Sequence, residues 1–317
     1  MQDAELIVSS SPHQRTAVST PVIMSDVVLA LMPAALAGVW FFGLRAFAMM
    51  VLCVAAAVGT EAGLQRLMKR PVTVGDYSAV VAGLLLALVL PPDLPLWMGV
   101  IGAVFSMAIA KFIFGGLGQN IFNPALIGRA VLLASWPVFM TRWRWPIFSA
   151  PWIPDFDAVS SATPLALLKL GGIRTPYLNL FLGNVAGSIG ETSALAILVG
   201  AAYLLYRGHI SLRIPVSFIG TVAVLTALLG QDPLFHVLAG GLMLGAFFMA
   251  TDYVTSPVTP KGQIIFGMGC GVLTVFIRLY GGYPEGVCYA ILIMNAATAL
   301  IDRSTMPRKF GEVRKVA

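Results

Sequence analysis

A heptapeptide with a hydroxyl group at its end, Asp157-Ala158-Val159-Ser160-Ser161-Ala162-Thr163, lies in the one long polar loop of a very hydrophobic chain. Thr163 offers a hydroxyl acceptor, and the small side chains of Ser160, Ser161 and Ala162 leave its backbone accessible. Such a residue could receive a phosphate-bearing group from a modifying enzyme. The pattern therefore makes Thr163 a candidate attachment point, with Asp157 to Ala162 as its attachment motif.

The pattern Asp-x-x-Ser-x-Ala-Thr resembles the signature at which a flavin transferase joins FMN to a threonine hydroxyl through a phosphodiester. A second interpretation is structural: Ser160 or Ser161 caps a short helix that continues to Leu170, with Pro164 in its first turn. The two interpretations are compatible, because a helix N-terminus also favours a phosphate group.

A glycine-rich stretch, Gly115-Gly116-Leu117-Gly118-Gln119-Asn120-Ile121-Phe122-Asn123-Pro124-Ala125, precedes a hydrophobic segment. It lacks the Gly-Lys-Ser/Thr of a nucleotide-binding P-loop. Asn120 and Asn123 could line a cofactor or ion path in a re-entrant or half-helix element. The alternative is a loop that only lets two helices pack closely.

Ionisable residues near or within hydrophobic segments form a third group of candidates, because a charge inside a bilayer costs roughly 2.5–3.5 kcal/mol on insertion scales. Glu61, Glu191 and Asp252 fall near the ends of segments, as does Lys111, and their side chains could reach water there. The candidates for an ion or flavin path are Asn120, Asn123, Arg129, Glu61, Glu191 and Asp252. Arg129 and Arg278 are expected to pair with a carboxylate, or with a phosphate or carbonyl of a bound group.

The composition indicates that the chain is surrounded by lipid and not by water. Of the 317 residues, 58% are hydrophobic and only 11% are charged, whereas a soluble domain carries about 25% charged residues. The net charge of +6 is attributed to the positive-inside rule, and no basic run interleaved with aromatic residues indicates nucleic-acid binding. Three cysteines in apolar stretches and three scattered histidines predict neither a metal centre nor a hydrolase. The cysteines are expected to be buried.

An all-α polytopic membrane protein is the predicted fold, with about ten transmembrane helices in two five-helix inverted repeats. The expected spans lie near 25–43, 46–62, 77–92, 94–114, 121–140, 190–206, 212–230, 234–251, 263–280 and 285–301. The predicted organisation is an N-terminal cytoplasmic arm (1–24), a first repeat (25–140), a periplasmic loop (141–189), a second repeat (190–301) and a basic cytoplasmic tail (302–317).

Sequence pairs suggest the duplication: Pro95-Leu96-Trp97 matches Pro233-Leu234-Phe235, and the stretch from Lys111 matches that from Asp252. Five spans in each half, an odd number, would invert the second copy. The short basic loops place both termini in the cytoplasm and Thr163 on the periplasmic side.

Several of these stretches occur in the order found in the NqrB/RnfD family, which the chain resembles from about residue 24 to 303. The most specific are Gly115 to Ala125, Asp157 to Ala166 and Ala250 to Gly262, joined by Gly281 to Gly286 and Asn295-Ala296. The short N-terminal arm is more similar to the RnfD branch. The resemblance implies covalent FMN at Thr163, although Ser161 stands where the consensus usually has Gly. It also implies a second, noncovalent flavin (riboflavin), for which no residue can be assigned.

The resemblance implies a bacterial inner-membrane protein of the Rnf complex that passes electrons between ferredoxin and NAD pools in coupling to Na⁺ or H⁺ translocation. Its expected partners are iron–sulfur, NADH-binding and flavin-bearing subunits of the same complex, the flavin transferase and membrane lipid. Thr163 would be a cofactor tether, so no catalytic residue is assigned, and the chain alone would complete no reaction. Two alternatives remain, a channel or secondary transporter without flavin and a structural scaffold within the complex.

Overall fold

The computed structural model describes residues 18–146, 162–282 and 285–307, and every regular element in these ranges is a helix, as predicted. The elements are α1 (Thr20–Phe42), α2 (Leu44–Leu67), η1 (Val74–Asp76), α3 (Ser78–Leu88), α4 (Leu96–Phe105), η2 (Ser106–Phe112), α5 (Pro124–Ser135), α6 (Pro137–Met140), α7 (Pro164–Gly171), α8 (Tyr177–Leu182), α9 (Ala194–Tyr206), α10 (Arg213–Leu228), α11 (Pro233–Leu238), α12 (Leu242–Leu244), η3 (Gly245–Met249), α13 (Pro260–Tyr280) and α14 (Val287–Thr305).

Within the described residues, four helices are long and apolar enough to cross a membrane: α1, α2, α13 and α14. Ten full spans are therefore not confirmed. Five further apolar helices (α3, α4 with η2, α5, α9 and α10) are shorter. A helix of about 12 residues is about 18 Å long, less than the roughly 30 Å hydrocarbon core.

The segment predicted as a continuous span at 234–251 is divided into α11, α12 and η3. Gly240, between α11 and α12, has a φ of 69°, a left-handed conformation that favours glycine and ends a helix. At the N-terminus, α1 begins at Thr20, inside the stretch expected to be a polar arm, with Pro21 in its first turn.

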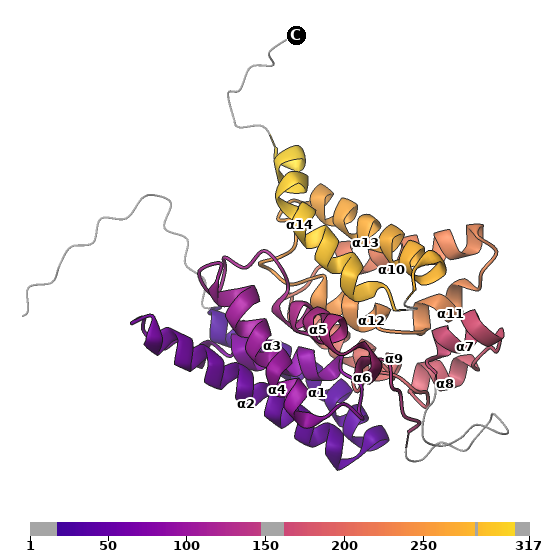
Figure 1. The fold of residues 1–317 in the computed structure, drawn as a ribbon. Helices are drawn as coiled ribbons and strands as arrows, with labels where there is room; N and C mark the ends of the chain where they lie inside the picture. Colours follow the sequence, from indigo (N-terminus) through magenta and orange to yellow (C-terminus); the bar gives the residue numbers. More distant parts are fainter. Residues whose placement is uncertain (1–17, 147–161, 283–284, 308–317) are drawn as a thin grey trace, which may run out of the picture.

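The short helix α3 lies at the centre of the first half, where it packs against α1, α2, α4 and α5. Nine of its residues are buried: Ser78, Ala79, Ala82, Gly83, Leu84, Leu85, Leu86, Ala87 and Leu88. In Figure 1, α1 to α4 (indigo to magenta) lie on one side, and α10, α13 and α14 (orange to yellow) on the other. The two halves meet where α1 packs against α9 and α5 packs against α14.

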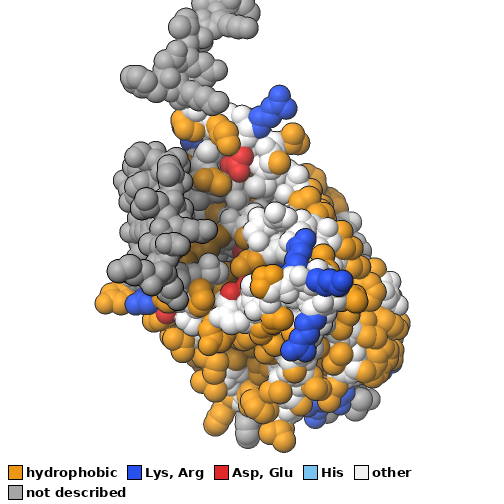
Figure 2. Space-filling view, turned by 90° about the vertical axis from the view of Figure 1, so that its left-hand side faces the viewer, with side chains coloured by type: hydrophobic (Ala, Val, Ile, Leu, Met, Phe, Trp, Pro, Cys, Tyr) orange, Lys and Arg blue, Asp and Glu red, His pale blue; other side chains and the backbone are white. Residues whose placement is uncertain are grey.

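Hydrophobic side chains cover much of the face that Figure 2 shows (orange). Exposed examples come from both halves: Leu36, Trp40, Phe47, Leu228, Phe276 and Leu300. Apolar patches of this extent on a chain of such composition indicate contact with lipid. The core is also largely apolar, so the helices carry hydrophobic side chains both toward the core and toward the outer surface.

Backbone hydrogen bonds fix the loop before α9 against the C-terminal end of α3. Gly190 N donates to Leu88 O at 2.7 Å, and Ile189 N donates to Leu90 O at 3.1 Å. The N-terminal end of α3 instead faces η2. Consequently, most of the candidate polar residues gather at two places, one at each end of α3.

Candidate functional sites at the two ends of α3

Thr163 is the N-cap of α7 and is 2% exposed. Its Oγ1 accepts a hydrogen bond from Ala166 N at 3.3 Å, and Pro164 occupies the first turn. The short helix expected after the heptapeptide is therefore confirmed. The expected cap was wrong: Thr163 itself, not Ser160 or Ser161, provides the capping oxygen, because its extended backbone directs the hydroxyl at the first turn.

Only the end of the attachment motif belongs to the described residues. Ala162 is partly buried beside Thr163, whereas Asp157, Ser160 and Ser161 lie outside the described residues. The Thr163 hydroxyl therefore has two available roles. It caps a helix, and its position at a helix N-terminus suits a phosphodiester.

A pocket beside Thr163 encloses about 310 Å³ of empty space, part of it open to solvent. Its walls include Ser188, Glu191, Thr192, Gly240 and Glu285. Thr192 is 4% exposed, and its Oγ1 has no hydrogen-bond partner among the described residues. An orphaned hydroxyl in a pocket that already holds the acceptor Thr163 fits a bound polar group such as a phosphoryl ester.

Arg129 joins three segments behind this pocket. Its Nη1 donates to Glu191 Oε1 at 3.2 Å and to Val89 O at 2.6 Å, while Nη2 donates to Glu285 Oε2 at 2.5 Å. Ser188 Oγ donates to the other oxygen of Glu191 at 2.7 Å. The expected carboxylate partner of Arg129 is thus confirmed, and its guanidinium holds the C-terminal end of α3, the loop before α9 and the segment before α14 to α5.

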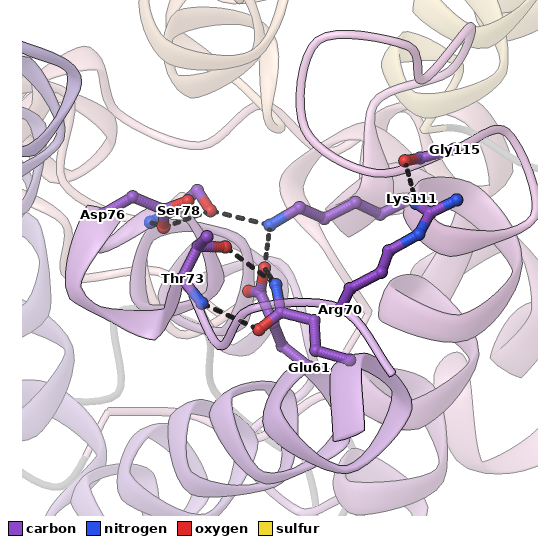
Figure 3. A network of polar contacts seen from close by, with 8 residues as sticks. Glu61, Arg70, Thr73, Asp76, Ser78, Lys111 and Gly115 are labelled. Atoms are coloured by element: carbon purple, nitrogen blue, oxygen red, sulfur yellow. Dashed lines mark hydrogen bonds and ion pairs between the residues drawn. The ribbon is translucent and has the colours of Figure 1, made fainter. Parts of the chain in front are cut away.

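A second buried network lies at the N-terminal end of α3 (Figure 3). Lys111 Nζ donates to Glu61 Oε1 and to Ser78 Oγ, both at 2.7 Å, and Ser78 Oγ donates to Asp76 Oδ1 at 2.6 Å. Gln65 Nε2 adds a hydrogen bond of 3.2 Å to Glu61 Oε1. The four elements α2, η1, α3 and η2 are joined by these contacts.

The expectation that Glu61 and Lys111 could reach water is wrong. Their side chains are 1% and 3% exposed, because α2, α3 and the π-helical segment η2 pack together around them. Glu61 Oε2 has no hydrogen-bond partner among the described residues. An ion pair removed from water and incompletely satisfied costs folding free energy, so its presence favours a function over a role in stability.

A cavity enclosing about 830 Å³ of empty space, part of it open to solvent, adjoins this network and brings together residues far apart in the sequence. Lys111, Asn120, Asn123, His209 and Asp252 line it. Asn123 Nδ2 donates to Met249 O at 3.3 Å and its Oδ1 caps α5, accepting from Ala125 N at 3.0 Å. The glycine-rich stretch therefore caps the short helix α5 and lines the cavity, and its role in an ion or cofactor path stays a prediction.

The other walls of this cavity are largely apolar and come from both halves: Val27, Val81, Ala82, Leu85, Phe247 and Phe248. Largely apolar walls with a few placed polar groups are typical of ligand sites.

Asp26 forms a polar cluster that the sequence did not reveal. It is 5% exposed and accepts from Tyr203 Oη at 2.8 Å and Arg207 Nε at 2.9 Å, and His209 Nε2 lies 2.6 Å from its Oδ2. The only sequence signal is an acid in an otherwise apolar helix. Glu285 begins the expected span 285–301 and lies in the Gly281 to Gly286 motif, but the sequence does not indicate that it pairs with Arg129. Cys53, Cys270 and Cys288 are buried free thiols, as expected.

Comparison with known proteins assigns the chain to a family. The model of the NQR2, RnfD, RnfE family matches residues 7–311. The chain is 55% identical over 315 residues to the D subunit of the Na⁺-translocating ferredoxin:NAD⁺ oxidoreductase complex of Acetobacterium woodii, covering 98% of this chain and 97% of that one.

Two further relatives also align over nearly their full lengths. The D subunit of the proton-translocating ferredoxin:NAD⁺ oxidoreductase complex of Clostridium ljungdahlii is 52% identical, over 97% of this chain and 96% of that one. The D subunit of the ion-translocating oxidoreductase complex of Halorhodospira halophila is 40% identical, over 96% and 95%. The sequence motifs, the helical membrane architecture and the end-to-end match agree, and the chain belongs to the NQR2, RnfD, RnfE family.

Proposed function

We propose that this chain is the RnfD component of an Rnf-type membrane complex, passing electrons between ferredoxin and NAD pools in coupling to ion translocation. The full-length similarity to relatives named for this role carries the proposal. One such relative is named for Na⁺ and another, almost equally similar, for protons. Similarity therefore leaves the ion open between Na⁺ and H⁺.

Thr163 would carry FMN through a phosphodiester. The flavin, when bound, supplies the capacity to take up one or two electrons, and the protein supplies position and electrostatics. The N-terminus of α7 would face the phosphate, and the pocket beside Thr163 would accept it. Arg129 would balance the carboxylates of Glu191 and Glu285 behind that pocket.

A second, noncovalent flavin of the riboflavin type would occupy the cavity at the other end of α3. Phe247 and Phe248 offer apolar aromatic walls, while Asn120 and Asn123 offer polar contacts. Glu61 and Lys111 lie beside this cavity and are the first candidates for coupling to ion movement. Asp252, on the cavity wall, is the next.

The architecture would be ten membrane segments in two inverted repeats, several of them shorter than the bilayer. Packing supports this proposal: the first helices of each half contact each other (α1 and α9), as do the last (α5 and α14). Each half also places a cation at the end of its fourth segment, Lys111 in η2 and Arg278 in α13, bound to its third segment. The matching tripeptides that begin at Pro95 and Pro233 instead pair α4, in the fourth segment of the first half, with α11, in the third segment of the second half. These sequence pairs therefore do not support the inversion.

We place both termini in the cytoplasm and Thr163 on the periplasmic side of a bacterial inner membrane. The lysines and arginines of the short loops favour this orientation. The two sites would then face opposite sides, separated by α3, whose 11 residues extend about 16 Å. Iron–sulfur and NADH chemistry would belong to other proteins of the complex, and a further flavin-bearing partner and the flavin transferase would approach from the periplasm.

The attachment can be tested with the chain co-expressed with an active flavin transferase and then denatured on a gel. The wild type should retain flavin fluorescence. Thr163→Asn should lose it, although asparagine keeps an oxygen able to cap α7, because it offers no hydroxyl. Thr141→Asn is the matched control, since Thr141 is an exposed threonine that does not line the pocket and should be dispensable for attachment.

Fluorescence retained by Thr163→Asn would overturn the assignment of Thr163. A wild type without flavin, beside a positive control showing that the transferase is active, would favour the channel or transporter alternative. The scaffold alternative predicts something different: neutralising Glu61, Glu191 or Asp252 should leave ion pumping by the assembled complex unchanged.

A further inference from the structure

A further pocket, distinct from the two described above, lies along α7. It encloses about 600 Å³ of empty space, part of it open to solvent, and cationic and hydrogen-bond-donating side chains line it. Lys169, Gln231, His236 and Arg278 contribute its polar walls. His236 is 3% exposed, and neither of its ring nitrogens has a hydrogen-bond partner among the described residues. A buried imidazole of this kind, at a cavity, indicates a missing polar ligand.

Arg278 strengthens this indication. It is 3% exposed, and its guanidinium donates only to backbone carbonyls, those of His236 at 2.5 Å and Ala239 at 3.0 Å. Among the described residues, no carboxylate forms an ion pair with it, and its Nε has no partner. Glu285 and Glu191 act on this charge only from beyond contact distance, so an anion in the pocket would complete the site.

This pocket is adjacent to the pocket of Thr163. Gly240 lines the Thr163 pocket, and a Cβ atom at Gly240 would lie 3.1 Å from Nη2 of Arg278 and 2.8 Å from Leu165. Lys169 follows Thr163 by fewer than two turns of α7. Its Nζ donates to the carbonyls of Arg278 and Gly281 at 3.0 and 2.6 Å.

We propose that Lys169, His236 and Arg278 form the anion-binding pocket that receives the flavin group carried by Thr163 and stabilises its reduced, negatively charged ring. The inference rests on the proposed attachment. A flavin ring that takes up two electrons and one proton gains one negative charge. Cations beside the ring favour that state and raise its reduction potential. The electrons are those that the proposed electron-transfer function supplies, and no bond to protein forms or breaks.

The test is a spectroelectrochemical titration of the covalent flavin in the purified complex, after in-gel fluorescence has shown equal flavin content. Lys169→Gln and His236→Asn should keep the flavin and lower its midpoint potential. We expect at least a tenfold shift of the redox equilibrium for Lys169→Gln, about 30 mV for a two-electron couple. Arg278→Gln should act in the same direction, and Lys169→Gln carries the test should the arginine variant fail to fold.

The matched control is Arg174→Gln. Arg174 lies just after α7 and has the same charge as Lys169, but its side chain is 67% exposed and does not line the pocket, so its loss should leave the potential unchanged. If all three pocket variants had full flavin content and the wild-type midpoint potential, the anion-binding inference would be overturned and the proposed attachment at Thr163 would stand. If, in addition, less phospholipid co-purified with these variants than with the wild type, the pocket would be assigned to a lipid phosphate instead. A wild type without covalent flavin would overturn the proposed attachment as well.

Discussion

The ion pair between Lys111 and Glu61 gives a sharp quantitative prediction. The two side chains are 3% and 1% exposed, and the Nζ to Oε1 distance is 2.7 Å. Lys111→Met would leave the Glu61 carboxylate buried with only the 3.2 Å hydrogen bond from Gln65 on that oxygen and none on Oε2. Breaking a buried pair in this way costs about 3–5 kcal/mol of unfolding free energy.

The two single variants should differ. Glu61→Leu leaves the Lys111 ammonium with its hydrogen bond to Ser78 Oγ, which in turn contacts Asp76. We therefore expect Glu61→Leu to lower the free energy of unfolding by about 3 kcal/mol and Lys111→Met to lower it by about 5 kcal/mol. The double variant replaces both charges by apolar side chains and should lie within about 1 kcal/mol of the wild type, or exceed it in stability.

The assay is equilibrium unfolding in detergent micelles with increasing denaturing detergent, followed by far-ultraviolet circular dichroism. Each 1.4 kcal/mol corresponds to about a tenfold change in the folding equilibrium, so the folding equilibria of the single variants should differ from that of the wild type by roughly two to three and a half orders of magnitude. Lys261→Met, at an exposed lysine, controls for loss of charge. Strictly additive effects in the double variant, or single effects below about 1 kcal/mol, would refute the reasoning.

Two other predictions concern contacts between segments. Arg129→Gln should destabilise the chain by about 3–5 kcal/mol, because Glu191 and Glu285 lose their shared cation; adding Glu191→Gln and Glu285→Gln should recover much of the loss, and a triple variant less stable than the single one would contradict this. The pKa of Asp232 is lowered, chiefly because the Tyr177 hydroxyl donates to its carboxylate. Its stabilisation should be present above the unfolded pKa of 3.8 and be lost as the pH falls through the lower folded pKa. Tyr177→Phe should weaken this acid dependence of the thermal midpoint, and an unchanged profile would count against the contact.

Sequence patterns were most informative where local chemistry decides the outcome. Composition predicted a helical membrane protein, since lipid requires backbone groups to be satisfied within each segment. Pro164 and its neighbours predicted the helix after the heptapeptide, and Arg129 predicted a carboxylate partner. Segment length was predicted poorly. Hydrophobicity runs through Gly240, whereas the backbone turns there and divides the expected span at 234–251.

The sequence by itself determined that the chain lies in lipid, that it is helical, which family it belongs to and that Thr163 offers a hydroxyl group. These properties depend on composition and on residues that are neighbours in the chain. Only the tertiary structure brought Glu61 to Lys111, Arg129 to Glu285, and Arg278 to the far side of the Thr163 pocket. Each of these contacts joins residues on different helices or segments. Their pairing depends on how short, broken helices pack around α3, and hydrophobic periodicity carries no information about which polar ends will meet.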